Sequence, residues 1–213
     1  MKKYPENFDA KDIKCVIFDF DNTMYYSDTQ LEAKLAWLQN AIVTLGGKTQ
    51  AQAKELMLKT GFTACNPHQP SFSSHLPLFG ITMDAWQEYQ SETRYFVDNV
   101  QIVPNVYYET LRAKYPLYIV TNSFVHDINI KAEKYGIDFN SFKIYGCEHG
   151  KKHMNKKETY AKIAEDLNLS PKNLLIIGDR LKIDIFPLLE LDGNGVLVSN
   201  TDEVKTVIEE LLQ

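Results

Sequence analysis

The strongest structural signal in the chain is KCVIFDFDNT, residues 14–23. Its apolar run, Cys15 to Phe18, is short and bounded by polar residues, which is typical of a buried central strand, although length alone does not exclude a helix. In a strand, side chains alternate between faces, so Asp19 and Asp21 point one way while Phe20 points the other. Two carboxylates at the end of a buried strand repel each other, and a cation between them removes that cost. Oxygen ligands suit Mg²⁺. The alternative is a polar strand-to-loop junction, since Asp and Asn are common in turns.

Length and composition indicate an ordinary globular protein. The 213 residues suffice for one domain, or for one domain that carries a sizeable insertion. A hydrophobic share of 44% and a charged share of 24% are typical of a chain with a real core. The net charge of −5 gives no electrostatic reason to expect a nucleic acid polymer or an anionic membrane as a partner. We expect a monomer or a weak dimer that binds a small molecule.

The cysteines and the amino-terminal sequence bear on the compartment. Cys15, Cys65 and Cys147 are far apart, which argues against a disulfide framework and fits no zinc spacing. The first six residues lack the apolar core of a signal peptide, and no apolar run approaches membrane-spanning length. We therefore expect a soluble, cytoplasmic protein.

The region from residue 25 to about residue 100 is expected to be all helical. Apolar residues at helical spacing predict helices over residues 31–45, 50–59 and 82–97. Between the last two, residues 61–80 contain three prolines and several serines, and we expect a long irregular connection there. Residues 1–12 are polar and are expected to be a lead-in to the first strand.

From residue 104 onward, predicted helices and strands alternate, which indicates a parallel sheet with helices on both faces. The fold class is therefore α/β, with a doubly wound, Rossmann-like core formed by residues 1–24 and 101–213 and an inserted all-helical block, residues 25–100. The expected helices cover residues 104–114, 126–135, 156–167, 183–189 and 202–212, and the expected strands cover residues 117–120, 143–145, 174–177 and 196–198.

Three of the predicted strands end in polar residues, and the ends of parallel strands meet at one edge of a sheet. The residues concerned are Asp19 and Asp21, then Thr121 and Asn122, then Asp179. A cluster of lysines between residues 151 and 157 precedes a predicted helix and can reach the same edge. These groups offer a carboxylate nucleophile, a second carboxylate as acid and base, metal ligands, a hydroxyl and an ammonium. Together they form an inventory for phosphoryl transfer.

The order of these pieces resembles the haloacid dehalogenase-like superfamily, whose members are mostly phosphatases. The family's Asp-x-Asp-x-Thr motif matches Asp19–Thr23, its strand-closing Thr matches Thr121, and its Gly-Asp motif with a later Asp matches Gly178-Asp179 and Asp184. The resemblance covers nearly the whole chain, and it implies that residues 25–100 are a small helical cap. Within the family, residues 22–25 look most like the branch that contains pyrimidine 5′-nucleotidases.

The resemblance also implies a role for each matching residue. Asp19 would attack phosphorus and become an aspartyl-phosphate, and Asp21 would protonate the leaving oxygen and then activate water. Thr121, with backbone N–H groups near Asn122, would hold phosphate oxygens. The cap would exclude water and recognise the leaving group. The ligands of Mg²⁺ would be Asp19, the main-chain carbonyl of Asp21 and Asp179, with support from Asp184.

One family motif has no clear match. The family places a lysine shortly before the helix that leads to the last metal-binding strand, and the usual spacing falls near Met154, which has no positive charge. Lys152, Lys156 and Lys157 are the candidates for this phosphate-binding role. We favour Lys156, which is nearest on the helix side.

The sequence therefore predicts a Mg²⁺-dependent phosphatase that hydrolyses a small phosphorylated metabolite, a nucleotide or a sugar phosphate, through an aspartyl-phosphate. A phosphosugar mutase would keep every residue discussed and stays open as the alternative. Asp21 argues against a dehalogenase, and the helical block fits poorly with a signalling receiver domain. A catalytically silent phosphate-binding protein on the same scaffold is a further alternative.

Overall fold

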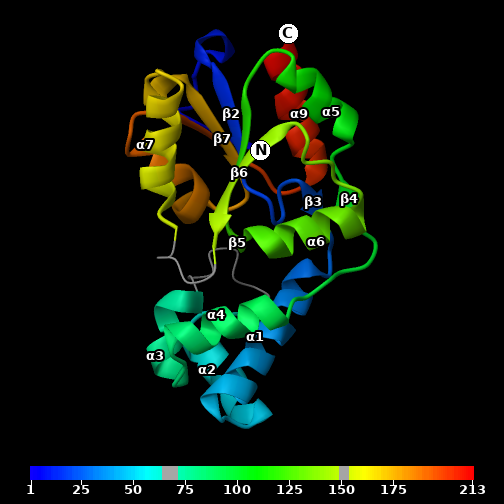
Figure 1. Ribbon diagram of the computed structural model, residues 1–213, viewed down its shortest axis with the longest axis vertical. Coiled ribbons are helices and arrows are strands. Elements are labelled where there is room, and N and C mark those ends of the chain that lie inside the picture. The colour runs from blue at the N-terminus through cyan, green and yellow to red at the C-terminus, as the bar shows by residue number, and fades with distance from the viewer. Residues whose placement is uncertain (64–71, 149–153) are drawn as a thin grey trace. The chain divides into compact units, whose positions relative to one another are not determined.

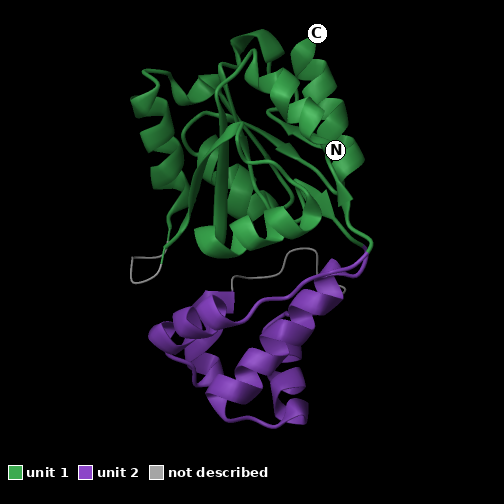
Figure 2. Ribbon diagram, turned by 45° about the vertical axis from the view of Figure 1, so that its right-hand side comes forward, with its two compact units in different colours: residues 1–27, 99–213 green, residues 28–98 purple. Residues whose placement is uncertain are grey.

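The structure is a computed structural model that describes residues 1–63, 72–148 and 154–213. The chain divides into two compact units, residues 1–27 with 99–213 (unit 1) and residues 28–98 (unit 2) (Figure 2). Each unit has its own core, and each is described by itself below.

Unit 1 is built on a six-stranded sheet with strand order β1-β8-β7-β2-β5-β6. Neighbouring strands run parallel, except that β1 runs antiparallel to β8. The predicted α/β fold with a doubly wound sheet is confirmed. The chain leaves β2, builds β5 and β6 on one side, and returns to build β7 and β8 on the other. The strands are β1 (Lys2–Tyr4), β2 (Cys15–Phe18), β5 (Leu117–Phe124), β6 (Phe142–Cys147), β7 (Leu174–Gly178) and β8 (Asn194–Leu197).

Helices cover both faces of this sheet because side chains alternate along each strand. Cys15 and Ile17 of β2 pack into an apolar cluster with Ile163 of α7, while the Phe18 ring meets the Tyr108 ring of α5 edge-on at 5.4 Å. Accordingly, α7 lies on one side of the strands, and α5 and α9 lie on the other (Figure 1). The helices of unit 1 are α5 (Asn105–Arg112), α6 (Val125–Tyr135), α7 (Lys156–Asp166), α8 (Phe186–Leu189) and α9 (Thr201–Leu212).

The described residues of unit 2 form helices and no strand. Thr49 caps α2 with its side chain, and Thr82 does the same for α4. The core of the unit includes Trp86, whose ring centroid lies 5.2 Å from that of Trp37. The helices are α1 (Gln30–Gly46), α2 (Gln50–Lys59), α3 (Leu76–Phe79) and α4 (Met83–Glu92).

Two predictions for unit 2 were wrong in part. The helix predicted over residues 82–97 ends at Glu92, because Thr93 adopts an extended conformation and its hydroxyl bonds to the carbonyl of Tyr89. The connection predicted over residues 61–80 contains a 3₁₀ turn, Phe72–His75, and α3, in which Pro77 stands in the first turn and therefore breaks no helical hydrogen bond. Residues 64–71 lie outside the described part.

Unit 1 also contains pairings that local sequence patterns did not predict. The predicted lead-in holds β1, which pairs with the edge strand β8, and a short 3₁₀ helix, Ala10–Asp12. A two-stranded ribbon joins β3 (Tyr25–Tyr26) to β4 (Gln101–Ile102). The strand β5 continues past residue 120 to Phe124, and its register against β6 shifts over these last residues.

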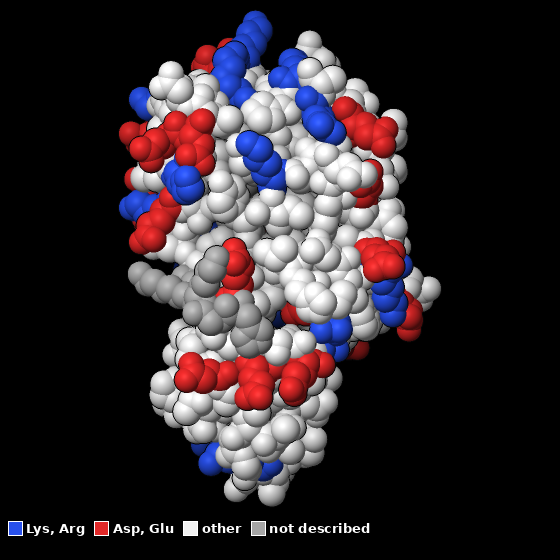
Figure 3. All heavy atoms as spheres, in the orientation of Figure 1, with Lys and Arg blue, Asp and Glu red and all other residues white. Residues whose placement is uncertain are grey.

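On the face drawn in Figure 3, acidic and basic side chains lie near one another on unit 1, whereas a row of acidic side chains crosses unit 2. None of the helices formed by the described residues is long and apolar enough to cross a membrane.

Candidate active site

The first candidate residue, Asp19, directly follows the central strand β2. Its backbone N–H donates to the carbonyl of Ile177 at 2.9 Å, which extends the pairing of β2 with β7 by one residue. The chain then turns sharply, because Asn22 adopts a left-handed conformation with φ of 61°. Asn is one of the residue types that adopts this conformation most readily. Phe20 is fully buried, which anchors the loop between the two aspartates.

A buried lysine joins two carboxylates at this edge. Lys156, the first residue of α7, donates hydrogen bonds from Nζ to Oδ1 of Asp19 at 2.8 Å and to Oδ1 of Asp184 at 2.7 Å. Burial alone would lower the pKa of Lys156, but the charges of Asp184 and Asp19 raise it well above its usual value. Burial and the charge of Asp184 raise the pKa of Asp19 to about 7, although Lys156 acts in the opposite direction. Lys156 therefore stays protonated beside Asp19 at neutral pH.

A third carboxylate completes a compact cluster. Asp179 directly follows β7, and one carboxylate oxygen from each of Asp19, Asp179 and Asp184 lies within 4.8 Å of the others. Asn22 donates from its side chain to Oδ2 of Asp179 at 3.2 Å. The loop after β2 and the end of β7 therefore bond to each other at the cluster.

The position of Asp184 depends on Gly178. Asp184 lies in a single π-helical turn, Leu181–Ile185, and its Oδ2 accepts a hydrogen bond from the backbone N–H of Arg180 at 2.9 Å. A Cβ atom on Gly178 would lie 2.7 Å from the Cβ of Asp184 and 2.9 Å from its Oδ2. Only glycine permits this approach without a shift of Asp184. This close contact is the steric reason for a glycine at position 178, directly before Asp179.

Asp21 has a set of partners of its own. Its Oδ1 accepts hydrogen bonds from Lys131 Nζ at 2.7 Å and from the Tyr25 hydroxyl, and its Oδ2 accepts one from the Ser123 hydroxyl at 2.7 Å. Burial alone would raise the pKa of Asp21, but the charge of Lys131 and these hydrogen bonds outweigh burial and hold it below its ordinary value. Asp21 is therefore ionised at neutral pH in the structure as it stands.

The end of β5 adds a hydroxyl and backbone groups. Thr121 is buried, and its Oγ1 accepts a hydrogen bond from the Ser123 N–H at 3.1 Å, which leaves the hydroxyl proton for another acceptor. The carbonyl of Asn122 accepts a hydrogen bond of 3.3 Å from the thiol of Cys147. Burial raises the pKa of that thiol, so Cys147 is a neutral neighbour of the site and not a thiolate ligand.

This geometry agrees with a comparison against protein families, in which the profile described as haloacid dehalogenase-like hydrolase matches residues 13–192. The chain belongs to this family. A search of curated proteins found no significant match.

Solved structures of this fold include other members of the family. A phosphatase of the family from Thermococcus onnurineus aligns with a TM-score of 0.54 at 17% identity, over 87% of this chain and 86% of that one. A hydrolase of the family from Xanthomonas campestris aligns with a TM-score of 0.52 at 18% identity, over 94% of this chain and 92% of that one. A predicted phosphoglycolate phosphatase from Haemophilus somnus aligns with a TM-score of 0.53 at 20% identity, over 88% of this chain and 85% of that one. These similarities support the fold of the hydrolase.

The lysine candidates of this hydrolase have different surroundings. Lys156 bonds Asp19, as described above, whereas Lys157 points to Glu190 at 2.8 Å and is 44% exposed. Lys152 lies outside the described residues. The structure thus brings Lys156 to the edge with Asp19, Asp179 and Asp184, and it leaves Lys157 on the surface.

Three partners of Asp21 were not among the predicted site residues. Ser123 follows the predicted site residue Asn122 directly, and Tyr25 lies two residues after the Asp19–Thr23 motif. Lys131 could have been found from the pattern of α6, because it shares the buried face of that helix with Ile128 and Ala132. A lysine on an apolar helical face needs a buried partner, and that was the available signal.

The donor set of the cluster suits the Mg²⁺ ion that the family implies. Asp19, Asp179 and Asp184 each contribute carboxylate oxygens, which are hard ligands, and the positive charge of Lys156 is shared between two of the three. A divalent cation held there would offset carboxylate charge that would otherwise be repulsive. These residues fit the ion.

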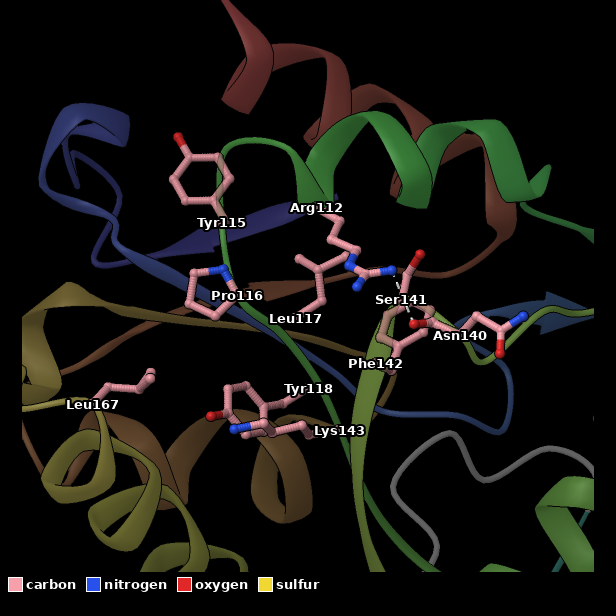
Figure 4. A pocket seen from close by; sticks show the side chains of 10 residues that line it. All are labelled: Arg112, Tyr115, Pro116, Leu117, Tyr118, Asn140, Ser141, Phe142, Lys143 and Leu167. Atoms are coloured by element: carbon pink, nitrogen blue, oxygen red, sulfur yellow. Dashed lines mark hydrogen bonds between the residues drawn. The ribbon is translucent and has the colours of Figure 1, made fainter.

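One pocket lies at the opposite edge of the sheet from these residues. It has a volume of about 370 Å³ and is lined by residues that include Pro116 and Leu117 at the start of β5 and Phe142 at the start of β6 (Figure 4). Arg112 donates to the carbonyl of Asn140 at its rim at 3.1 Å. The pocket is at the amino ends of the strands, so it is separate from the candidate site.

Proposed function

We propose that this hydrolase is a Mg²⁺-dependent phosphatase that acts on a small phosphorylated metabolite through an aspartyl-phosphate. The observation that supports this most strongly is the placement of Asp19, at the carboxyl end of the central strand, beside a buried lysine and two further carboxylates. A carboxylate in this setting has a cationic neighbour to stabilise charge on a transferring phosphoryl group.

In the first step, a carboxylate oxygen of Asp19 forms a bond to phosphorus while the bond from phosphorus to the ester oxygen breaks. Asp21 donates a proton to that ester oxygen, and the leaving group departs as a neutral alcohol. A phosphate dianion close to Asp21 adds negative charge, which raises the pKa of Asp21 and favours the protonated form that this step needs.

In the second step, Asp21 takes a proton from water, and the water oxygen bonds to phosphorus. The bond between phosphorus and Asp19 breaks, which releases inorganic phosphate, restores Asp19 as a carboxylate and leaves Asp21 protonated for the next cycle. Lys156 and the Thr121 hydroxyl would hold phosphate oxygens through both steps, together with backbone N–H groups near Asn122.

The ion would be held by Asp19, Asp179, Asp184 and the main-chain carbonyl of Asp21. When bound, Mg²⁺ supplies positive charge that stabilises the charge on the transferring phosphoryl oxygens.

Substrate selection is assigned to unit 2. This unit is inserted between β3 and β4, and β3 begins only a few residues after Asp21. We propose that it serves as the cap that excludes water and recognises the leaving group, which would be a nucleoside or a sugar. The likeness of residues 22–25 to the 5′-nucleotidase branch favours a nucleotide.

To test this proposal, the purified protein is assayed with Mg²⁺ on a panel of nucleoside monophosphates and sugar phosphates. The assay measures the release of inorganic phosphate. We expect hydrolysis of at least one class, and loss of that activity in the Asp19→Asn variant. Wild-type activity in Asp19→Asn, or no release of phosphate from any ester, would contradict the proposal.

A further inference from the structure

Asp21 is held by side chains that lie outside the family motifs described above. Lys131 of α6 bonds its Oδ1 at 2.7 Å, and the hydroxyl of Tyr25 in β3 donates to the same oxygen. The hydroxyl of Ser123 at the end of β5 bonds Oδ2 at 2.7 Å. Donors from three different elements therefore converge on one carboxylate.

The burial of Lys131 is unusual for a structural lysine. It is 4% exposed and lies between Ile128 and Ala132 on the inward face of α6, where an apolar side chain would pack without any charge to compensate. A buried ammonium is unfavourable unless it is paired and hydrogen-bonded. Lys131 meets this condition through Asp21, and its Nζ also lies 3.2 Å from the hydroxyl oxygen of Tyr25.

Tyr25 is equally fixed. Its side chain is fully buried, its ring packs against Phe20 at 5.1 Å and Tyr135 at 4.9 Å, and its backbone pairs with Ile102 of β4. A rigid aromatic side chain with few rotatable bonds places its hydroxyl more accurately than a long exposed chain does. The group that Tyr25 points at is thereby held in one orientation.

We propose that Lys131 and Tyr25 are positioning residues that hold the Asp21 carboxylate in the orientation from which it passes a proton to the leaving oxygen. This inference rests on the proposed function, in which Asp21 is the acid and base. Proton transfer needs the two heavy atoms within hydrogen-bonding reach, and a carboxylate with one oxygen released can rotate away from the line of transfer.

A positioning role predicts a dependence on the leaving group. An alkyl phosphate needs a proton on its departing oxygen, whereas 2,4-dinitrophenyl phosphate releases a stable anion and needs little help. If the orientation of Asp21 is lost, hydrolysis of the alkyl phosphate should therefore slow far more than hydrolysis of 2,4-dinitrophenyl phosphate. A general loss of structure should slow the hydrolysis of both esters alike.

The test compares Lys131→Met with wild type on an alkyl phosphate and on 2,4-dinitrophenyl phosphate. Since a general acid contributes about 10²- to 10⁴-fold, we expect kcat for the alkyl ester to fall by about tenfold or more beyond any fall for the dinitrophenyl ester, with KM nearly unchanged. Lys134→Met, an exposed lysine of the same helix, is the matched control and should leave both rates unchanged. The proposal would be overturned by an equal fall in kcat for both esters, by no fall in kcat, or by a rise in kcat for the alkyl ester.

A second arm uses Asp21→Asn as the background. If Lys131 acts through Asp21, adding Lys131→Met to Asp21→Asn should change the alkyl ester rate by less than about twofold, because interacting residues are not additive. A further loss as large as that of Lys131→Met alone would contradict the inference. Tyr25→Phe removes one hydroxyl and keeps the ring, so it should show the same leaving-group dependence at smaller size even if Lys131→Met does not fold.

The controls separate this inference from the proposed function. If Asp21→Asn leaves the alkyl ester rate unchanged, the proposed role of Asp21 fails and this inference fails with it. If Asp21→Asn shows the leaving-group dependence while Lys131→Met and Tyr25→Phe do not, only the positioning role is overturned.

Discussion

Lys156 donates a hydrogen bond of 2.8 Å from Nζ to Oδ1 of Asp19, across a sequence separation of 137 residues. The bond connects the start of α7 to the end of β2, and both groups are buried. In such a place an ammonium and a carboxylate interact strongly, and the loss of either leaves an uncompensated charge.

Replacement of Lys156 by Met should therefore affect both activity and stability. We expect kcat to fall by about 10²-fold or more, because one group that stabilises charge on the phosphoryl oxygens is lost. We expect the free energy of unfolding in the metal-free protein to fall by about 3 to 5 kcal/mol, because two buried carboxylates lose a partner.

Lys157→Met is the matched control for this prediction. Its exposed pair with Glu190 should contribute about 0 to 1 kcal/mol, and its loss should not change kcat. Steady-state kinetics and urea unfolding of both variants check these values, and equal effects of the two would count against the role of Lys156.

Binding of Mg²⁺ should stabilise the wild-type protein and should depend on the carboxylate cluster. At a concentration of about 100 times the dissociation constant, a ligand that binds only the folded state adds about 2.7 kcal/mol to the free energy of unfolding. Asp179→Asn should lose most of this gain, whereas Asp192→Asn, an exposed carboxylate elsewhere, should keep it. Thermal unfolding with Mg²⁺ and with EDTA measures this stabilisation in both variants. If Mg²⁺ stabilises Asp179→Asn as much as the wild-type protein, the assignment of Asp179 as a ligand is contradicted.

Gly178→Ala should act on the same cluster through steric displacement. The added Cβ would come within 2.9 Å of Asp184 Oδ2, so Asp184 has to move, and we expect the stabilisation by Mg²⁺ to be lost. In Gly136→Ala, the added Cβ meets no atom within 4 Å, but φ is +75°, so that variant should lose about 1 kcal/mol of stability and keep its response to Mg²⁺. If both variants respond normally to Mg²⁺, the steric account of Gly178 is wrong.

The pH dependence of stability should carry the signature of Asp19. Its pKa is about 7 in the folded protein and near 3.8 when exposed, so between these values the folded state binds more protons than the unfolded state. The free energy of unfolding in EDTA should therefore fall as pH rises through this range. Asp21 adds little to this slope, because its lowered pKa keeps it ionised there in both states.

Asp19→Asn removes the titrating group and should flatten this slope, whereas Asp192→Asn should not. Urea unfolding across the range, with each variant compared with wild type, isolates the contribution. Identical slopes in Asp19→Asn and wild type would show that Asp19 does not titrate there.

The parts of this fold that could be predicted from the sequence are those set by local patterns. The strand β2 was expected from its short, bounded apolar run, and the helix Gln50–Lys59 was expected from the helical spacing of its apolar residues. The end of β2 at Phe18 places Asp19 at the sheet edge. Lys156 was favoured among three lysines because it is nearest to the start of a predicted helix, and it lies at this edge.

Pairings between distant segments could not be predicted. The strand β1 is polar and short, so only its register with β8 reveals it. The contact between Lys131 and Asp21 spans 110 residues, and nothing near either residue in the sequence indicates the other. Thr93 ends α4 early because its hydroxyl bonds a backbone carbonyl and accepts from Trp37 of another helix, a tertiary interaction that helical periodicity does not include.

The aspartyl-phosphate is the central claim, and trapping it is the most direct test. The Asp21→Asn variant, in which breakdown of the intermediate should be slow, is mixed with Mg²⁺ and 2,4-dinitrophenyl phosphate, quenched in acid, and examined by mass spectrometry. We expect one added phosphoryl group, mapped to the peptide that contains Asp19 and absent from the Asp19→Asn, Asp21→Asn double variant. Release of phosphate with no phosphorylated protein, or a phosphoryl group on another residue, would contradict the account.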